Sequence, residues 1–205
     1  GIPSLRVVAP CHFYGGAGEL LYNSVINQSE PVLFVENKLQ YLLKILEKNG
    51  SGEVDFEIVS GDDVEQIYPV FKAGIRGAPK PELTIITYGY MTELACQAMV
   101  ELAYQNEVFV EVMAFTQLSP LTIPENALQF FRDRDILIIE EGTRSWGLGA
   151  ELAAKICESC HPRPGKIQRI AAKDEIIPAS PVLEKKMLPQ VADIIHTVKT
   201  MRGGR

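Results

Sequence analysis

The sequence lacks a surplus of basic residues: 20 Lys and Arg stand against 26 Asp and Glu, a formal net charge of −6 in 205 residues. Proteins that bind nucleic acid or anionic membrane surfaces need clustered positive charge, so we expect neither as a partner. No run approaches the roughly 18 apolar residues of a membrane span. With 46% hydrophobic and 22% charged residues, the composition is that of a globular protein with a sizeable core.

Cysteine and histidine are scarce. Four cysteines in so long a chain are too few for a disulfide framework, so we expect reduced thiols and a reducing compartment, the cytoplasm or, in a eukaryote, the mitochondrial matrix. Cys157-Glu-Ser-Cys160-His161 fits the attachment motif for c-type haem, but it ends an apolar helical stripe, which favours a structural role. The three histidines lie far apart, and no spacing predicts a metal site.

The first part of the chain predicts a strand–helix–strand unit. Apolar residues predict strands at 5–9 and 31–35, with a helix over 17–27 whose stripe is Leu20, Leu21 and Val25. Such a unit requires parallel strands. A second helix is predicted over 37–48, capped by Asn37, before a glycine-rich break at 49–52 that we interpret as a domain junction.

From residue 83 onward, strands and helices alternate. We predict strands at 55–59, 83–88, 108–113, 136–139 and 166–170, helices around 94–103, 122–132, 147–160 and 191–198, and a loop at 74–79. Thr122 and Glu125 form a potential capping box. The alternation predicts an α/β fold with three layers, in which a mainly parallel sheet carries helices on both faces.

Two motifs could bind a ligand. Gly15-Gly-Ala-Gly18 opens a helix and could cradle a phosphate, but it lacks the Lys-Ser/Thr of a P-loop, so a permissive helix start is favoured. Glu140 and Glu141 follow a buried strand, where open parallel sheets place ligand-binding groups. No neighbouring His, Cys or Lys completes an acid–base pair. We therefore favour carboxylates that cap helix amides or face a partner subunit.

Several blocks resemble a known family in order and spacing. They are P-V-L-F-V-E-N-K-L-Q-Y at 31–41, T-I-I-T-Y-G at 84–89, L-S-P-L at 118–121, E-E-G at 140–142, G-L-G-A-E at 147–151 and L-E-K-K-M-L-P-Q at 183–190. Together they resemble the beta subunit of thiamine-diphosphate-dependent 2-oxo acid dehydrogenases of the pyruvate, branched-chain and acetoin type. Residues 114–118 read A-F-T-Q-L where the family commonly has D-L-R-T-L, which leaves the 2-oxo acid open.

The resemblance implies a division of the chain at residue 48. Residues 1–48 would be the tail of a truncated pyrimidine-binding domain plus a linker, and residues 49–205 a transketolase-like C-terminal domain. In the family, the glutamate that activates thiamine and the active-site histidine precede this segment, and the alpha subunit holds the pyrophosphate and magnesium. We therefore assign no catalytic, cofactor-binding or metal-binding residue, and expect this chain alone to be inactive although its parent is an enzyme.

The role implied for this portion is association. The partners implied are the alpha subunit, a second beta subunit and, in some members, the lipoyl acyltransferase core. The candidate contact residues are Glu140, Glu141, Trp146, Leu183, Glu184 and Gln190. Trp146, in a loop, could anchor an interface or cover its own core. The alternative is a stand-alone, noncatalytic oligomerisation or docking module, because fold does not fix function.

Overall fold

A computed structural model describes residues 2, 4–46, 56–60 and 67–203. Its larger sheet has six strands in the order β3-β4-β6-β5-β8-β9. These are β3 (Phe56–Ser60), β4 (Val70–Ile75), β6 (Val110–Phe115), β5 (Leu83–Thr87), β8 (Asp135–Thr143) and β9 (Ile167–Ala172). β6, β5, β8 and β9 run parallel, whereas β4 is antiparallel to both of its neighbours, β3 and β6. The predicted mainly parallel sheet is confirmed.

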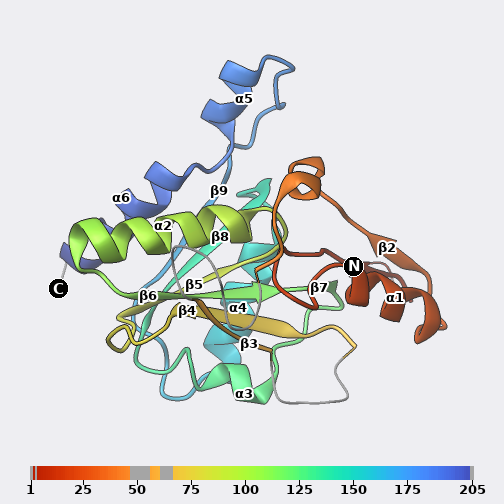
Figure 1. Cartoon of the computed structure of the whole chain (residues 1–205), viewed down its shortest axis with the longest axis horizontal. Helices are drawn as coiled ribbons and strands as arrows, with labels where there is room; N and C mark the ends of the chain where they lie inside the picture. The colour runs from red at the N-terminus through yellow and green to blue at the C-terminus, as the bar shows by residue number, and fades with distance from the viewer. Residues whose placement is uncertain (1, 3, 47–55, 61–66, 204–205) are drawn as a thin grey trace.

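Helices cover both faces of this sheet, as predicted (Figure 1). On one face, α2 (Met91–Asn106) and α6 (Val191–Gly203) pack on strand residues that include Ile85 and Leu137. On the other face, α3 (Glu125–Leu128) and α4 (Leu148–Ser159) pack on Ile86 and Ile138, the next residues along the same two strands. The side chains alternate because successive residues of a strand point to opposite faces. The sheet therefore lies between two hydrophobic cores.

A second sheet joins the first part of the chain to the rest. It has the order β2-β1-β7, with β1 (Arg6–Val8), β2 (Val32–Phe34) and β7 (Gln117–Ser119). β1 and β2 are parallel and are connected by α1 (Gly18–Ile26), so the predicted strand–helix–strand unit is confirmed. β7 pairs antiparallel with β1 and comes from the far side of the predicted junction. The junction at 49–52 lies outside the described residues.

The predicted helix over 37–48 is wrong for its described part. Only the short 3₁₀ helix η1 (Lys38–Leu42) forms, although Asn37 does cap it by accepting a hydrogen bond from Leu39 N at 2.9 Å. Of the apolar stripe that predicted this helix, Leu39 and Leu42 are 57% and 89% exposed, and Leu46 is packed against the core. Most helical stability in proteins comes from packing of such a stripe, and without it the helix does not continue.

The capping box at Thr122 is also wrong. α3 begins at Glu125 with Pro124 as its N-cap, and it ends at Leu128 instead of near 132. Proline disfavours helical backbone in the residue before it, which excludes Ile123 from a helix that Thr122 could cap. Three elements were missed: β4, whose end we predicted as the loop at 74–79, β7, and α5 (Pro181–Met187). Among the described residues, no helix has the length and apolarity needed to cross a membrane.

Candidate functional site

Glu140 lies inside the fold, near the carboxyl end of β8. The predicted strand was too short, because β8 continues through both glutamates to Thr143. Glu140 is 1% exposed, and its Oε1 accepts a hydrogen bond of 3.1 Å from Gly149 N in the first turn of α4. The carboxylate thus satisfies a free amide and complements the positive end of the helix dipole. The predicted capping of helix amides is confirmed for Glu140.

Glycines make room for this carboxylate. A Cβ at Gly147 would lie 2.6 Å from Glu140 Oε2, and one at Gly149 would lie 2.5 Å from Oε1. Burial raises the pKa of Glu140, while the amides of Gly149 and Leu148 and the charge of Arg169 oppose the rise. Burial, together with the Glu140 charge, raises the pKa of Tyr88 to about 12, so its phenol is neutral near pH 7.

Glu141 connects the first part of the chain to the sheet. Its Oε1 accepts a hydrogen bond of 2.8 Å from Asn37 Nδ2. Burial raises the pKa of Glu141, Asn37 lowers it, and the negative charge of Glu184 adds to the rise. The structure therefore brings Glu141 and Glu184, two of the predicted contact residues, within electrostatic reach of each other.

Trp146 points away from the protein. It is fully exposed, at 101%, and has a left-handed backbone with φ of 61°. The loop is held by Ser145, whose N and Oγ donate to the Asp174 carboxylate at 2.9 and 2.6 Å. These two bonds lower the pKa of Asp174. Trp146 does not cover its own core, so that alternative is wrong.

Leu183 and Glu184 belong to α5, which extends from the body of the protein (Figure 1). None of the seven residues of α5 is buried, and Leu183 is 49% exposed. Gln190 lies beyond the helix and has a structural task. Its N donates to Asp193 Oδ2 at 2.9 Å, and its Nε2 donates to the carbonyl oxygens of Leu188 and Pro189. Gln190 thereby fixes the start of α6.

His12 is a buried charge partner that the sequence analysis missed. Its Nε2 lies 3.0 Å from Glu93 Oε2 in the first turn of α2, and its side chain is 3% exposed. Burial lowers the pKa of His12, and the Glu93 charge opposes that shift. No spacing in the sequence pairs residues 12 and 93. Among the described residues, no group of three His, Cys, Asp or Glu side chains is arranged to hold a metal ion.

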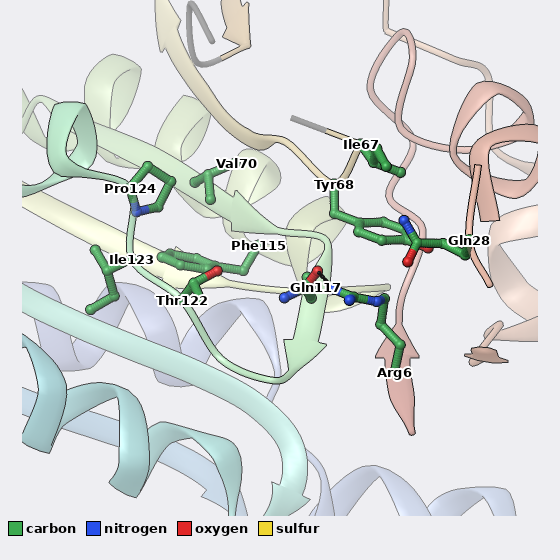
Figure 2. A pocket seen from close by; sticks show the side chains of 10 residues that line it. All are labelled: Arg6, Gln28, Ile67, Tyr68, Val70, Phe115, Gln117, Thr122, Ile123 and Pro124. Carbon is green, nitrogen blue, oxygen red and sulfur yellow. Dashed lines mark hydrogen bonds between the residues drawn. The ribbon is translucent and has the colours of Figure 1, made fainter. Parts of the chain in front are cut away.

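A cavity of about 340 Å³ lies between the two sheets (Figure 2). Its lining residues come from both parts of the chain: Arg6, Gln28, Ile67, Tyr68, Val70, Phe115, Gln117, Thr122, Ile123 and Pro124. Figure 2 shows the polar side chains of Arg6, Gln28 and Gln117 at one end, and Val70, Ile123 and Pro124 at the other. The sequence analysis missed this site, because its lining residues are spread from Arg6 to Pro124 and meet only in the folded protein.

Comparison with known proteins places this fold in a family. Residues 72–194 match the family model of the transketolase C-terminal domain. The chain belongs to that family. Over nearly its whole length, 201 residues, the chain is 28% identical to the pyruvate dehydrogenase E1 component subunit beta of Rhizobium meliloti. This match covers 98% of this chain and 40% of the relative. The corresponding protein of Gracilaria tenuistipitata is 30% identical over 202 residues, covering 98% and 57%.

The resemblance to beta subunits is thus confirmed as distant homology, and the chain spans about half the length of the curated relatives it matches. Solved structures support the transketolase-like fold alone. A split-gene transketolase described as an inactive beta4 tetramer has a TM-score of 0.58 at 16% identity, covering 97% of this chain and 58% of that one. Transketolase from Campylobacter jejuni also has a TM-score of 0.58, at 15% identity, covering 97% and 26%.

The relatives belong to enzymes that use thiamine diphosphate, whose activation requires a free carboxylate against the pyrimidine ring. The described residues of this transketolase C-terminal domain do not fit that task. Glu140, the best-placed buried carboxylate, is bound to Gly149 N and enclosed by two glycines. It does not line the cavity of Figure 2 either. We assign no residue of this chain to the cofactor.

Proposed function

We propose that this chain is the associating, C-terminal part of the beta subunit of a thiamine-diphosphate-dependent 2-oxo acid dehydrogenase. Residues 1–48 form the tail of a pyrimidine-binding domain, and residues 49–205 form the transketolase-like domain. In the assembled complex the enzyme decarboxylates a 2-oxo acid oxidatively and transfers the acyl group to lipoyl groups. Other parts of that complex hold thiamine diphosphate and magnesium. The homology to beta subunits supports this proposal.

The observation that carries the proposal is the outward-facing apolar surface around Trp146. Trp146 is fully exposed, and Val182 and Leu183 on α5 are 67% and 49% exposed. The hydrogen bonds from Ser145 to Asp174 tie the Trp146 loop to the segment that leads into α5. A tryptophan buries about 150–250 Å² when it is covered, and tryptophans are enriched among interface residues that dominate affinity. We assign this surface, the Trp146–α5 surface, to a second beta subunit.

The first part of the chain offers another apolar surface. α1 buries Leu20 as predicted, but Leu21 and Val25 from the same predicted stripe are 46% and 68% exposed. Tyr41 and Ile45, also exposed, line a cavity of about 280 Å³ together with Leu21. We assign this surface to the alpha subunit, the other partner that the resemblance implies.

The negatively charged surface beside α5 provides a third, weaker contact. Glu141 and Glu184 lie near each other beside the Trp146–α5 surface, and the chain has a net charge of −6. An acidic surface favours a basic partner and accelerates the encounter with it. The lipoyl acyltransferase core is the candidate for this contact. In this scheme Glu141, Trp146, Leu183 and Glu184 contact partners, whereas Glu140 and Gln190 hold the backbone behind them.

Sedimentation velocity of the isolated chain tests the association. We expect reversible self-association that Trp146→Ala weakens by about tenfold or more, the loss typical of a dominant interface residue. Tyr104→Ala is the matched control, because Tyr104 is an aromatic residue of α2 that is 69% exposed and lies outside the proposed surface. Equal self-association of the two variants would contradict the assignment.

A decarboxylation assay tests the assignment of chemistry to the missing parts. The isolated chain with thiamine diphosphate, magnesium and pyruvate should release no carbon dioxide above the protein-free control. Measurable turnover that depends on the chain would contradict the proposal. The alternative, a stand-alone module, is distinguished by the gene: an upstream reading frame that encodes a pyrimidine-binding domain supports the beta subunit, and a start codon near Gly1 supports the module.

A further inference from the structure

Two of the residues that line the cavity between the two sheets each carry a buried polar atom without a partner. Among the described residues, neither Arg6 Nε nor Tyr68 Oη makes a hydrogen bond, although both atoms are shielded from solvent. Both groups line the cavity of about 340 Å³ shown in Figure 2. Burying a polar group without a hydrogen bond is costly, so such groups are normally satisfied by a bound molecule when no protein partner is present.

The chemistry of the polar end favours an acceptor that carries negative charge. Arg6 has five N–H donors, and two of its described bonds go to Gln117 Oε1 at 2.8 Å and to Glu30 Oε2 at 3.0 Å. Arg6 Nε can only donate, and the Tyr68 hydroxyl can donate as well. The Glu30 side chain is 43% exposed and that of Arg6 is 21% exposed. Solvent therefore screens the negative charge of Glu30 more than the positive charge of Arg6.

The two side chains are held in place by contacts with each other and with Gln117. The Arg6 guanidinium lies over the Tyr68 ring at 5.5 Å from the centroid, and its bond to Gln117 fixes its orientation. Gln117 is fixed in turn, because its Nε2 donates to Pro120 O at 2.6 Å. Groups whose orientation is set before binding lose less entropy when a ligand arrives.

The other end of the cavity is mainly apolar, with Thr122 as its one polar lining residue. Val70 and Phe115 are 8% and 2% exposed, and Ile123 and Pro124 complete this end (Figure 2). A cavity of this size is at the lower limit of small-molecule sites, which combine an apolar lining with a few oriented polar groups. We propose that this cavity binds a small aliphatic monocarboxylate, with its carboxylate on Arg6 Nε and Tyr68 Oη and its chain against Phe115 and Pro124.

Calorimetric titration of hexanoate into the full 205-residue chain tests this proposal. We expect saturable binding at one site, and binding at least about tenfold weaker for hexan-1-ol, which has the same chain without the charge. Tyr68→Phe keeps the aromatic ring beneath Arg6 and removes only the hydroxyl. It should weaken hexanoate binding about tenfold, the effect of one hydrogen bond to a charged group.

Two further variants separate ligand contact from folding. Arg6→Gln should abolish the preference for hexanoate over hexan-1-ol, whereas Tyr104→Phe, on the exposed face of α2, should leave both affinities unchanged. No saturable binding of hexanoate by the wild-type chain would overturn the proposal, and so would equal affinities of wild type and Tyr68→Phe. Sedimentation of the same samples keeps this result separate from the proposed subunit association.

Discussion

Replacing Gly149 with alanine should destabilise the protein, although alanine normally stabilises a helix. A Cβ at Gly149 would lie 2.5 Å from Glu140 Oε1 and 3.2 Å from Ile138 Cγ2. Overpacking of this kind costs about 1–3 kcal/mol, and the higher helix propensity of alanine returns about 0.5–1 kcal/mol. We therefore expect the free energy of unfolding to fall, by up to about 2.5 kcal/mol, in urea titrations followed by circular dichroism.

Gly18→Ala is the matched control, because Gly18 is the first residue of α1 and nothing lies within 4 Å of its Cβ position. It should be neutral or should stabilise by about 0.4–1 kcal/mol. The two glycine substitutions should therefore differ in sign. In the background of Glu140→Ala, which removes the obstructing carboxylate, Gly149→Ala should cost less than in the wild type. If Gly149→Ala matches Gly18→Ala in stability, the contact between Glu140 and α4 is not as described.

Three further predictions concern the same region. Because burial raises the pKa of Glu140, the folded state binds its proton more tightly than the unfolded chain, so wild type should gain stability over Glu140→Gln as pH falls toward 4.5 in urea titrations; a constant difference would contradict this. Asn37→Ala removes the η1 cap and the bond to Glu141 and should cost about 0.5–2 kcal/mol in the same assay; no loss would refute these contacts. Trp146→Gly relieves a left-handed backbone and should raise the free energy of unfolding of the monomer by about 1–2 kcal/mol, whereas a lower free energy would show that Trp146 packs on its own core.

The sequence predicts the elements whose patterns are dictated by the main core. The apolar runs of β5 and β8 indicate strands that are covered on both faces, and the stripes of α2 and α6 are buried as their spacing indicates. In α4, Leu152 and Ile156 are buried, whereas Cys157 of the same predicted stripe is exposed. β4 was missed, because Gly74 and the Gly77-Ala-Pro79 segment resemble a turn, and its place in the sheet depends on pairing with β6, far along the chain. The helix predicted over 37–48 was overpredicted for the opposite reason: an apolar stripe was present, but its members Leu39 and Leu42 are left exposed.

The candidate site was predictable in part. The position of Glu140 after an apolar strand, ahead of glycines, indicates a carboxylate at a helix start, and its bond to Gly149 has that geometry. The contact of Glu141 with Asn37 joins residues 104 positions apart, and no local pattern encodes it. The same holds for Arg6 and Tyr68, which meet because β1 pairs with β7 and β4 pairs with β6. These contacts depend on pairing between strands that are far apart in the sequence, so they could not be predicted from local patterns.

Emission from the single tryptophan of the chain tests the proposed association most directly. Trp146 is fully exposed in the isolated subunit, so its fluorescence reports contact with a partner copy. Our account predicts blue-shifted emission, protected from iodide, at high protein concentration, and a shift to the red with full quenching on dilution. Emission that is red-shifted and equally quenched at every concentration would contradict it.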